Sequence, residues 1–403
     1  MALDPTESSA LKLAAVDPAL SGAGSLAEMV PRGTILPSRT LFHAGPPLSE
    51  SGTDIPIPLL QSAAVAAVVE GWVSSQAEGL AAIQSGEIFL APAQDNGLVV
   101  PLAFVAGPST GVLRVTEANG DGAALAAIND GPPLGALRFG RPTDDTVARL
   151  HELNTVVAEA LGETLRNDPV PLLPIAGAAL RDGDDLHGQV AASSDAILAL
   201  LAERLAGGPA AAPVAAANQF FLNVWMASCA LMLKAGAGIP HSRLIVAAAG
   251  NGRDFGIKLA GAPDHWLTCP AATPKGPLLS PDLADALPLP AVGDSAVIDA
   301  CGFGAQALGF CPALRTAFGD AIADGVAEAP DRLLRTVHAG FGGLEIRVGL
   351  DIDRIGESPF CANLAMIDAD GKHGLIGRGI ANLMKDNVAV AGLSPVAQTK
   401  EQS

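Results

Sequence analysis

The longest stretch of the chain without a charged residue includes Ala206 to Leu233, and it places the strongest constraint on the fold. A segment of this kind either crosses a membrane or lies inside a protein core. Its length suits a membrane span, but Pro213, Asn218 and Asn223 interrupt it, and no comparable second segment exists. We therefore predict that residues 214–235 form a helix buried in the core of a large soluble protein.

The overall charge of the chain excludes two classes of partner. The net charge is −18, whereas nucleic acids and anionic membranes require a positive face. Small anionic substrates remain compatible with this charge, because local arginines act at short range. We expect a small-molecule substrate and neither nucleic acid nor membrane as a partner.

Length and cysteine usage indicate the size and compartment of the protein. With 403 residues the chain is long enough for two or three domains. Its start, MALDPTESS, lacks a basic region followed by an apolar one, so we expect no signal peptide. The five cysteines include no CxxC pair and lie mostly in apolar surroundings, which favours buried thiols in a reducing cytoplasm. Cys269 is accordingly expected in the core.

Patterning divides the chain into three parts. Residues 1–142 alternate strands and helices with Gly/Pro turns, after a loosely structured lead-in over 1–35 that contains one short helix. Residues 143–208 contain amphipathic helices joined by a proline-rich connection. Residues 209–403 mix strands and helices without a regular βαβ order and carry most candidate site motifs. We predict an α/β fold of mixed α+β character, multi-domain, with a small all-helical middle domain.

The stretch LIVAAAGNGRDFGIKLAG, residues 244–261, contains a pattern that superficially matches a dinucleotide-binding loop. Such a loop opens a helix, whereas FGIKLAGAPDHW alternates and soon meets glycine and proline, which is typical of a strand. Asn-Gly between two apolar runs indicates a hairpin. We predict a plain hairpin; the alternative is a hairpin tip that also forms the rim of a binding site through Asn251, Gly252, Arg253 and Asp254.

Two histidines are candidate proton carriers. His43 lies where a strand meets a Gly-Pro-Pro turn, a position that suits either acid/base chemistry or a hydrogen-bonded structural role. Asp184 and His187 are three residues apart, so on a helix they would share one face and the aspartate would fix the imidazole tautomer. The alternative is a solvated helix start. One histidine with one aspartate is too few for a metal site, and we expect no metal or cofactor.

Uncharged polar residues and one lysine are candidate substrate ligands. Asn218 and Asn223 lie on the apolar segment and would complement the N–H and C=O groups of a ureide or amide, or else connect loops. Asp294 and Ser295 precede a predicted helix, where they would cap it or present its free N–H groups to an anion. Lys275, in a Gly/Pro loop, would pair with an anionic substrate or be simply solvated.

Several of these stretches, taken in order, resemble the AllG/YlbE-like family, a subunit of the oxamate carbamoyltransferase associated with allantoin degradation. The resemblance extends over nearly the whole chain from about residue 35, and GNGxDFGI and GDSA are its most specific motifs. The matching stretches are HAGPPL (43–48), NDGPPLGALRFG (129–140), GDDLH (183–187), NQFFLNVWMASCALML (218–233), AAAGNGRDFGIKLAGAPDHWLTCPA (247–271), PKGPLL (274–279) and PAVGDSAVIDACGFGAQAL (290–308).

The resemblance implies a multi-domain α/β fold with a small helical domain in the middle. It also implies carbamoyl transfer, in which carbamoyl phosphate and oxamate give oxalurate and phosphate or the reverse, within a complex of partner subunits. The family pattern places a histidine-rich stretch before an asparagine where this chain has APAQDNG, which keeps Asn96. It also has an Asn…His-Lys segment near the C-terminus, where this chain keeps Asn363 but has Asp368 at the histidine position.

Three functional hypotheses follow. The first is a cytoplasmic, oligomeric enzyme acting at a C–N bond of a small carbamoyl, ureide or amide compound, with His43, His187, Asp184 and Asp294 moving or orienting protons. The second is a hydrolase that opens a cyclic amide, imide or ureide. The third, favoured by the missing histidines, is a non-catalytic subunit that binds ligand or partner while another chain carries out the chemistry.

Overall fold

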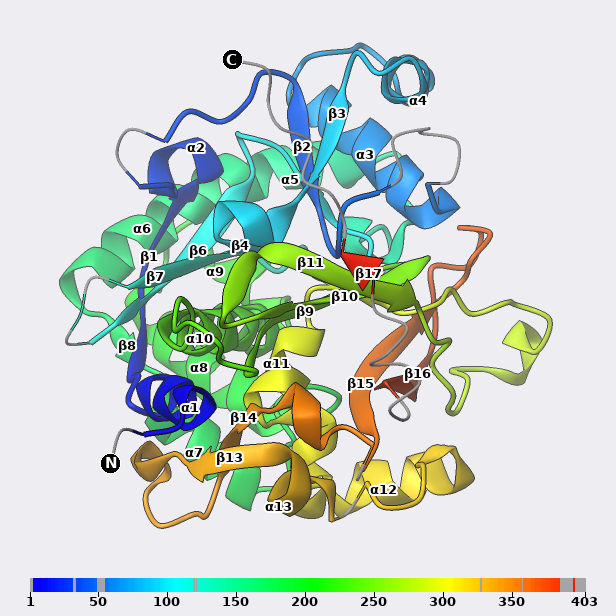
Figure 1. Ribbon diagram of the computed structural model, residues 1–403. Helices are drawn as coiled ribbons and strands as arrows, with labels where there is room; N and C mark the ends of the chain where they lie inside the picture. Colours follow the sequence, from blue (N-terminus) through cyan, green and yellow to red (C-terminus); the bar gives the residue numbers. More distant parts are fainter. Residues whose placement is uncertain are drawn as a thin grey trace.

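The computed structural model describes residues 3–31, 34–48, 55–118, 120, 122–326, 328–356, 358–384 and 394–395. The fold is of the α/β class and is arranged around one buried helix, α10 (Phe220–Ala235), which contacts strands of both five-stranded sheets (Figure 1). Trp225 on this helix stacks on Phe221 with ring centroids 5.5 Å apart, and Phe303 meets it edge-on at 5.0 Å. The predicted buried helix is thereby confirmed.

The boundaries of the apolar segment differ from the prediction. Residues 214–235 do not form one helix, because a turn at 216–219 separates α10 from the short helix α9 (Ala211–Ala215). Asn218 and Gln219 lie in this turn, a position that polar side chains favour over the interior of a helix. Within the part of the chain that the structure describes, no helix combines the length and apolarity needed to cross a membrane.

The first sheet includes the N-terminal segment, which the sequence analysis wrongly predicted to be a loosely structured lead-in. Strand β1 (Pro18–Ser25) pairs antiparallel with β6 and also with β8. Its sequence, PALSGAGS, has few β-forming residues, so its local pattern does not indicate a strand. The sheet order is β4-β7-β6-β1-β8, with β4 Leu98–Val99, β6 Gly111–Glu117, β7 Ala123–Ala127 and β8 Val170–Pro171.

The second sheet contains the predicted hairpin. Strands β9 (Ile245–Asn251) and β10 (Asp254–Leu259) pair antiparallel, and β11 (Ala262–Pro270) continues the sheet. At the tip, Asn251 Oδ1 accepts the backbone N–H of residues 253 and 254 at 3.0 and 2.8 Å, which closes the turn. The strand order is β12-β9-β10-β11-β17, with β12 Val292–Gly293 and β17 Ser394–Pro395.

Three smaller sheets complete the strands that the structure describes. They are β3-β2-β5, with β2 Thr40–His43, β3 Phe89–Pro92 and β5 Val105–Ala106; β13-β14, with Leu334–Val337 and Arg347–Leu350; and β15-β16, with Phe360–Ile367 and Leu375–Met384. The hairpin β15-β16 lies on the right of Figure 1 and contacts α11.

Helices cover the sheets on several sides. The segment 143–208 is mostly helical, yet its β8 joins the first sheet and α6 packs on β1, so it shares the main hydrophobic core. The division of the chain into three domains stays a prediction. The helices not yet given are α1 Pro5–Ala14, α2 Leu26–Met29, α3 Ile57–Val69, α4 Gln76–Gln84, α5 Thr146–Glu152, α6 Ala158–Asn167, α7 Leu173–Arg181, α8 Ala191–Arg204, α11 Ala296–Cys301, α12 Pro312–Phe318 and α13 Ala329–Leu333.

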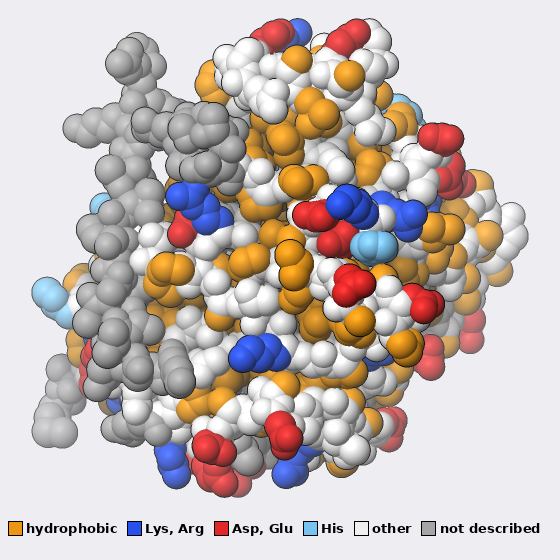
Figure 2. Space-filling model, turned by 90° about the vertical axis from the view of Figure 1, so that its right-hand side faces the viewer, with side chains coloured by type: hydrophobic (Ala, Val, Ile, Leu, Met, Phe, Trp, Pro, Cys, Tyr) orange, Lys and Arg blue, Asp and Glu red, His pale blue; other side chains and the backbone are white. Residues whose placement is uncertain are grey.

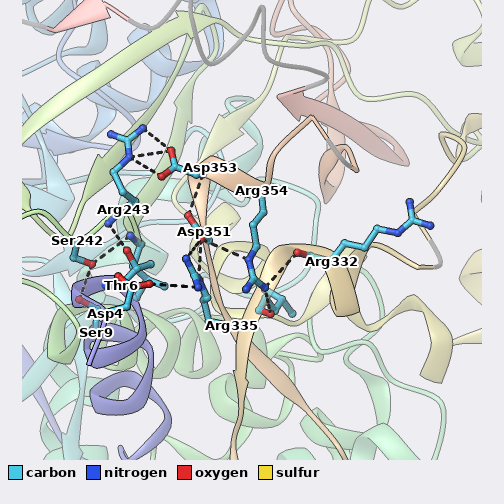
Figure 3. Close-up of polar contacts among 12 residues, drawn as sticks. Asp4, Thr6, Ser9, Ser242, Arg243, Arg332, Arg335, Asp351, Asp353 and Arg354 are labelled. Carbon is cyan, nitrogen blue, oxygen red and sulfur yellow. Dashed lines mark hydrogen bonds and ion pairs between the residues drawn. The ribbon is translucent and has the colours of Figure 1, made fainter. Parts of the chain in front are cut away.

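The N-terminal helix α1 is attached to the C-terminal half by polar contacts (Figure 3). Ser9 donates to Ser242 at 2.7 Å, and the guanidinium of Arg335 lies 3.5 Å from the carboxylate of Asp4. The same guanidinium pairs with the buried Asp351 at 2.6 Å. These contacts position the start of the chain against β13 and β14.

The surface charges and the state of the cysteines can be compared with what the composition predicts. On the face in Figure 2, charged side chains of both signs stand in small groups between hydrophobic and uncharged ones, without a broad positive area. All five cysteines are free thiols; Cys269 is partly buried, and the other four are buried.

The end of β2 approaches β9 so closely that only glycine fits there. A Cβ on Gly45, whose φ is +92°, would lie 2.6 Å from the backbone nitrogen of Asn251. We expect Gly45→Ala to lower the free energy of unfolding by about 3 kcal/mol, from left-handed strain plus overlap. Gly97 also has positive φ but open space around it, so Gly97→Ala should cost only about 1 kcal/mol. Urea denaturation of both variants measures the difference, and equal losses would contradict the close approach.

Candidate functional site

A cavity of about 330 Å³ lies where segments distant in sequence meet, and its size suits a small molecule. The loop between α7 and α8, the start of α10, the β12–α11 junction and the hairpin β15-β16 all contribute to its wall. Its polar lining residues are Asn129, Arg138, His187, Gln189, Asn218, Gln219, Asn223, Ser295, Asn363 and Arg378. A second hollow of about 410 Å³ near α12 has a mostly apolar lining, with Arg315 and Thr316 as its polar members. Chemistry therefore favours the first cavity.

A buried histidine–aspartate pair forms part of the cavity wall. His187 Nδ1 lies 2.6 Å from Asp299 Oδ2, and both side chains are almost completely buried. Burial raises the pKa of Asp299, while the charge and hydrogen bond of His187 oppose that rise. In its ionised form this carboxylate only accepts hydrogen bonds, so Nδ1 then carries the proton and Nε2 is the ring nitrogen left for a molecule in the cavity. Asp299 Oδ1 accepts the backbone N–H of Ala305 at 2.7 Å and of Asn363 at 3.2 Å.

A second carboxylate, that of Asp185, holds the loop that carries this histidine. Asp185 Oδ1 accepts the backbone N–H groups of His187 at 3.0 Å and Gln189 at 2.7 Å. Its carbonyl oxygen accepts the N–H of Gly304 at 2.8 Å. Gly304 has a φ of +58°, and a Cβ there would overlap the Asp299 carboxylate. The loop and the helix end are thus fitted to each other around the pair.

The environment of His187 shifts its acidity. Burial by itself lowers the pKa of His187, but the charge of Asp299, the hydrogen bond to Asp299 and the charge of Asp185 together outweigh burial and raise that pKa above its usual value. The imidazole is therefore a stronger base than a free histidine. A raised pKa and a fixed tautomer are what a proton acceptor for a weakly acidic N–H or O–H requires.

The remaining lining is rich in amides and contains one buried cation. Arg138 forms an ion pair with Asp130, donates to the carbonyl of Gly131 at 2.8 Å and lies over the ring of Phe139. Asn223 donates to the carbonyl of Ala127 at 2.7 Å, which leaves its Oδ1 for other partners. A guanidinium beside neutral amides suits a small ligand that carries both a carboxylate and an amide.

A separate cluster surrounds the other predicted histidine. His43, fully buried at the end of β2, has Nδ1 2.7 Å from the carbonyl of Ala44, and its Nε2 has no hydrogen-bond partner among the described residues. Burial lowers the pKa of His43 to about 4, despite that hydrogen bond and the charge of Asp95. Asp95 in turn pairs with Lys258 at 2.5 Å and accepts from Trp266 at 3.0 Å.

Asp294 lies in this second cluster and connects three segments. Its carboxylate accepts from Gln94 at 2.8 Å, from the N–H of Val100 at 2.8 Å and from the N–H of Gly45 at 3.2 Å. Burial raises its pKa to about 7 in spite of these three bonds. The next residue, Ser295, occupies the N-cap position of α11 but makes no capping hydrogen bond with its side chain, so neither predicted cap forms.

The cavity includes five residues that the sequence analysis singled out: His187, Asn218, Asn223, Ser295 and Asn363. The predicted helical pairing of Asp184 with His187 is wrong. Both residues lie in the loop before α8, where Leu186 has a φ of +67° and breaks the helix. The Asp184 carboxylate instead accepts from the N–H and hydroxyl of Ser193 at 2.9 and 2.8 Å, which caps α8.

The other predicted site residues lie outside the cavity lining. The side chain of Asn251 closes the hairpin turn, and Asn96 donates to the carbonyl of Pro92 at 3.3 Å. Lys275 is exposed, although its backbone pairs with Ile380. The remaining members of this group are Gly252, Arg253 and Asp254 at the hairpin tip and His43 and Asp294 in the second cluster.

Three residues of the site were not predicted from the sequence: Asp299, Arg138, and Asp185, which binds the backbone of the His187 loop. Asp299 stands within the apolar run AVIDACGF, and an acid in a buried helix must find a strong partner. That signal was present, but the partner, 112 residues away, was not visible. In the described part of the chain no three His, Cys, Asp or Glu side chains come together as a metal-binding group.

Fold and cavity together define an α/β protein with a site of small-molecule size beside a histidine–aspartate pair. The family model described as oxamate carbamoyltransferase subunit AllG matches residues 88–295, and the chain belongs to this family.

Three relatives extend the comparison. The oxamate carbamoyltransferase subunit AllG of Escherichia coli (strain K12) is 29% identical over 284 residues, which cover 67% of this chain and 66% of the relative. The uncharacterized protein YahG of the same organism is 26% identical over 390 residues, 91% of this chain and 80% of the relative. A crystal structure of a conserved protein of unknown function from Enterococcus faecalis V583 has a TM-score of 0.85 and 21% identity, covering 97% of this chain and 98% of that one. This structure shares the fold.

The opposite pKa shifts of His43 and Asp294 predict opposite effects of pH on stability. The folded protein disfavours protonated His43, so this group's contribution is lost as pH falls from 6.5 to about 4. The folded protein favours protonated Asp294, so the contribution of this group to the free energy of unfolding is lost as pH rises from 3.8 to about 7.

Relative to wild type, the unfolding free energy of His43→Asn should therefore fall by about 3 kcal/mol as pH rises through the first window. That of Asp294→Asn should rise by about 4 kcal/mol through the second window. Denaturation curves at a series of pH values measure both differences. Parallel pH profiles in the two variants and wild type would contradict the shifts.

Proposed function

We propose that this chain is an enzyme subunit acting at a C–N bond of a small carbamoyl or amide compound, and that its family reaction is carbamoyl transfer involving oxamate. The pair His187–Asp299 on the wall of the cavity supports this proposal most directly. The amide-rich lining and Arg138 supply complementary groups for an amide-bearing carboxylate. The relative AllG, an oxamate carbamoyltransferase subunit, suggests the reaction class.

In the reaction that the family resemblance implies, the amide nitrogen of oxamate attacks the carbamoyl carbon of carbamoyl phosphate. A C–N bond forms, the C–O bond to phosphate breaks with its electron pair, and the nitrogen loses one proton. His187 Nε2 accepts that proton, while Asp299 holds Nδ1–H and stabilises the imidazolium that results. In the reverse direction the same nitrogen of His187 returns the proton to the leaving amide.

A second candidate is a non-catalytic subunit, which is favoured because the relative AllG is itself a subunit of a carbamoyltransferase. In that case the cavity binds ligand while a partner chain carries out the chemistry. Turnover by the purified chain alone, against turnover only in a mixture with partner subunits, separates these possibilities. Water as the acceptor in place of oxamate would give hydrolysis, which is recognised by its products.

Substitutions in the pair test the proposal. We expect His187→Gln to reduce carbamoyl transfer, assayed with any required partner subunits, by about 100-fold or more, because general acid–base catalysis is typically worth that much. His338 is also buried, with Nε2 3.1 Å from the carbonyl of Val16, but it lies away from the cavity lining. His338→Gln should lower the melting temperature and leave turnover near wild type. Near-wild-type turnover in His187→Gln would remove this histidine from the chemistry.

The pH dependence of turnover tests the role of Asp299. Because the proton acceptor must be neutral, we expect wild-type turnover to fall as pH decreases through the raised pKa of His187. Asp299→Asn removes the negative charge that raises this pKa, so the acid limb should move to lower pH while the maximal rate falls. An acid limb that stays in place would show that another group controls it.

A further inference from the structure

The side-chain oxygen of Asn363 is a buried acceptor without a partner, and it belongs to the wall of the cavity. Asn363 has no exposed surface, and Oδ1 has no hydrogen bond within the described structure. A buried polar atom left unpaired costs free energy, so such atoms are normally paired. Asn363 is among the residues that line the cavity, so a molecule bound there is a candidate donor for this oxygen.

Two carboxylates fix the orientation of this asparagine. Its Nδ2 donates to Asp185 Oδ2, and its backbone N–H donates to Asp299 Oδ1 at 3.2 Å. Burial raises the pKa of Asp185, and the two backbone N–H groups that its other oxygen accepts oppose that rise. Because Nδ2 of Asn363 is the atom that donates to Asp185, Oδ1 is directed away from that carboxylate. The hydrogen bonds of Asn363 therefore leave Oδ1 as a free acceptor in a fixed orientation.

The same two carboxylates hold the proton-transfer histidine. Asp299 binds the ring of His187, and Asp185 binds its backbone N–H. The oxygen of Asn363 and the imidazole of His187 are thus set by one hydrogen-bonded unit, and both residues line the cavity. A ligand group that contacts both residues must donate a hydrogen bond to Asn363 Oδ1 and present its reacting proton to His187.

Building on the proposed function, we infer that Asn363 Oδ1 is a specificity determinant that accepts a hydrogen bond from the amide –NH2 of the substrate. A primary amide has two N–H groups, so one binds Oδ1 while the other faces the proton acceptor. A methyl or ester group at the same position offers no donor and leaves the oxygen unpaired. The site would thereby select small carboxylates that carry an amide over isosteres that carry a methyl group.

Oxamate and pyruvate provide a direct test, because they differ only in –NH2 against –CH3 beside the same oxo-carboxylate. Binding of each to the purified chain, alone and with any partner subunits needed for turnover, is measured by calorimetry. We expect wild type to bind oxamate at least 10-fold more tightly than pyruvate, the effect of one lost hydrogen bond to a buried acceptor. Equal affinities, or no binding of either compound, would overturn the inference.

Two variants locate the preference. Asn363→Leu removes the acceptor while keeping the volume, and it should bring the affinities of oxamate and pyruvate within about 2-fold of each other. Asn382 is a matched control, because its Oδ1 is also buried without a partner and it lies on the same hairpin but outside the cavity lining. Asn382→Leu should keep the wild-type preference. If Asn363→Leu fails to fold, Asn363→Ala replaces it, and the wild-type comparison needs neither variant.

The results separate this inference from the proposed function. Equal affinities for the two compounds, together with loss of transfer in His187→Gln, would reject the role of Asn363 and leave the proposed function in place. A clear oxamate preference that depends on Asn363, without transfer by the complex, would support the recognition and reject the reaction.

Discussion

The candidate site depends on the hydrogen bonds that the buried carboxylate of Asp299 accepts. This carboxylate lies at the first turn of the short helix α11 and binds groups from three other segments: the ring of His187, the backbone N–H of Ala305 and the backbone N–H of Asn363. A carboxylate buried this completely is tolerated only with such a set of donors. Because these donors come from the α7–α8 loop, the turn after α11 and strand β15, the same charge that orients the imidazole also joins the walls of the cavity.

Asp185 and Asp299 divide the work of holding the site. Asp185 fixes the backbone of the loop around His187 and the amide of Asn363, whereas Asp299 fixes the imidazole itself. The polar cluster around His43 and Asp294 is a different kind of arrangement. There His43 is neutral, and burial raises the pKa of Asp294 to about 7. Both side chains are buried where β2, β9 and the segment before Val100 pack together. That cluster supports the framework next to the cavity, since Asp294 precedes Ser295 in its lining.

Local patterns predicted the elements whose signals are local. The apolar segment became α10, and Asn-Gly between apolar runs became the β9–β10 hairpin, because burial and turn chemistry act over a few residues. Strand β1 was missed because its small residues form a strand only when β6, about a hundred residues later, supplies the partner backbone.

The candidate site shows the same division between local and distant signals. His187 was singled out by its spacing from an aspartate and Asn223 as an amide in an apolar segment, whereas Asn363 was singled out by the family resemblance. The partner of His187 could not be identified, since Asp184, three residues away, was the nearer candidate and Asp299 comes from another element. The orientation of the Asn363 amide could not be predicted either, because it depends on a hydrogen bond to Asp185, which is distant in the sequence.

The placement of β15 determines when the site becomes complete as the chain folds. A nascent chain that ends before residue 358 already contains His187, Asp185 and Asp299, but it lacks the strand whose backbone N–H occupies Asp299 and whose amide occupies Asp185. In such a fragment two buried carboxylates each lose a donor, so the fragment is expected to leave this region open to water. The wall of the cavity is therefore complete only when the β15-β16 hairpin, near the end of the chain, has docked.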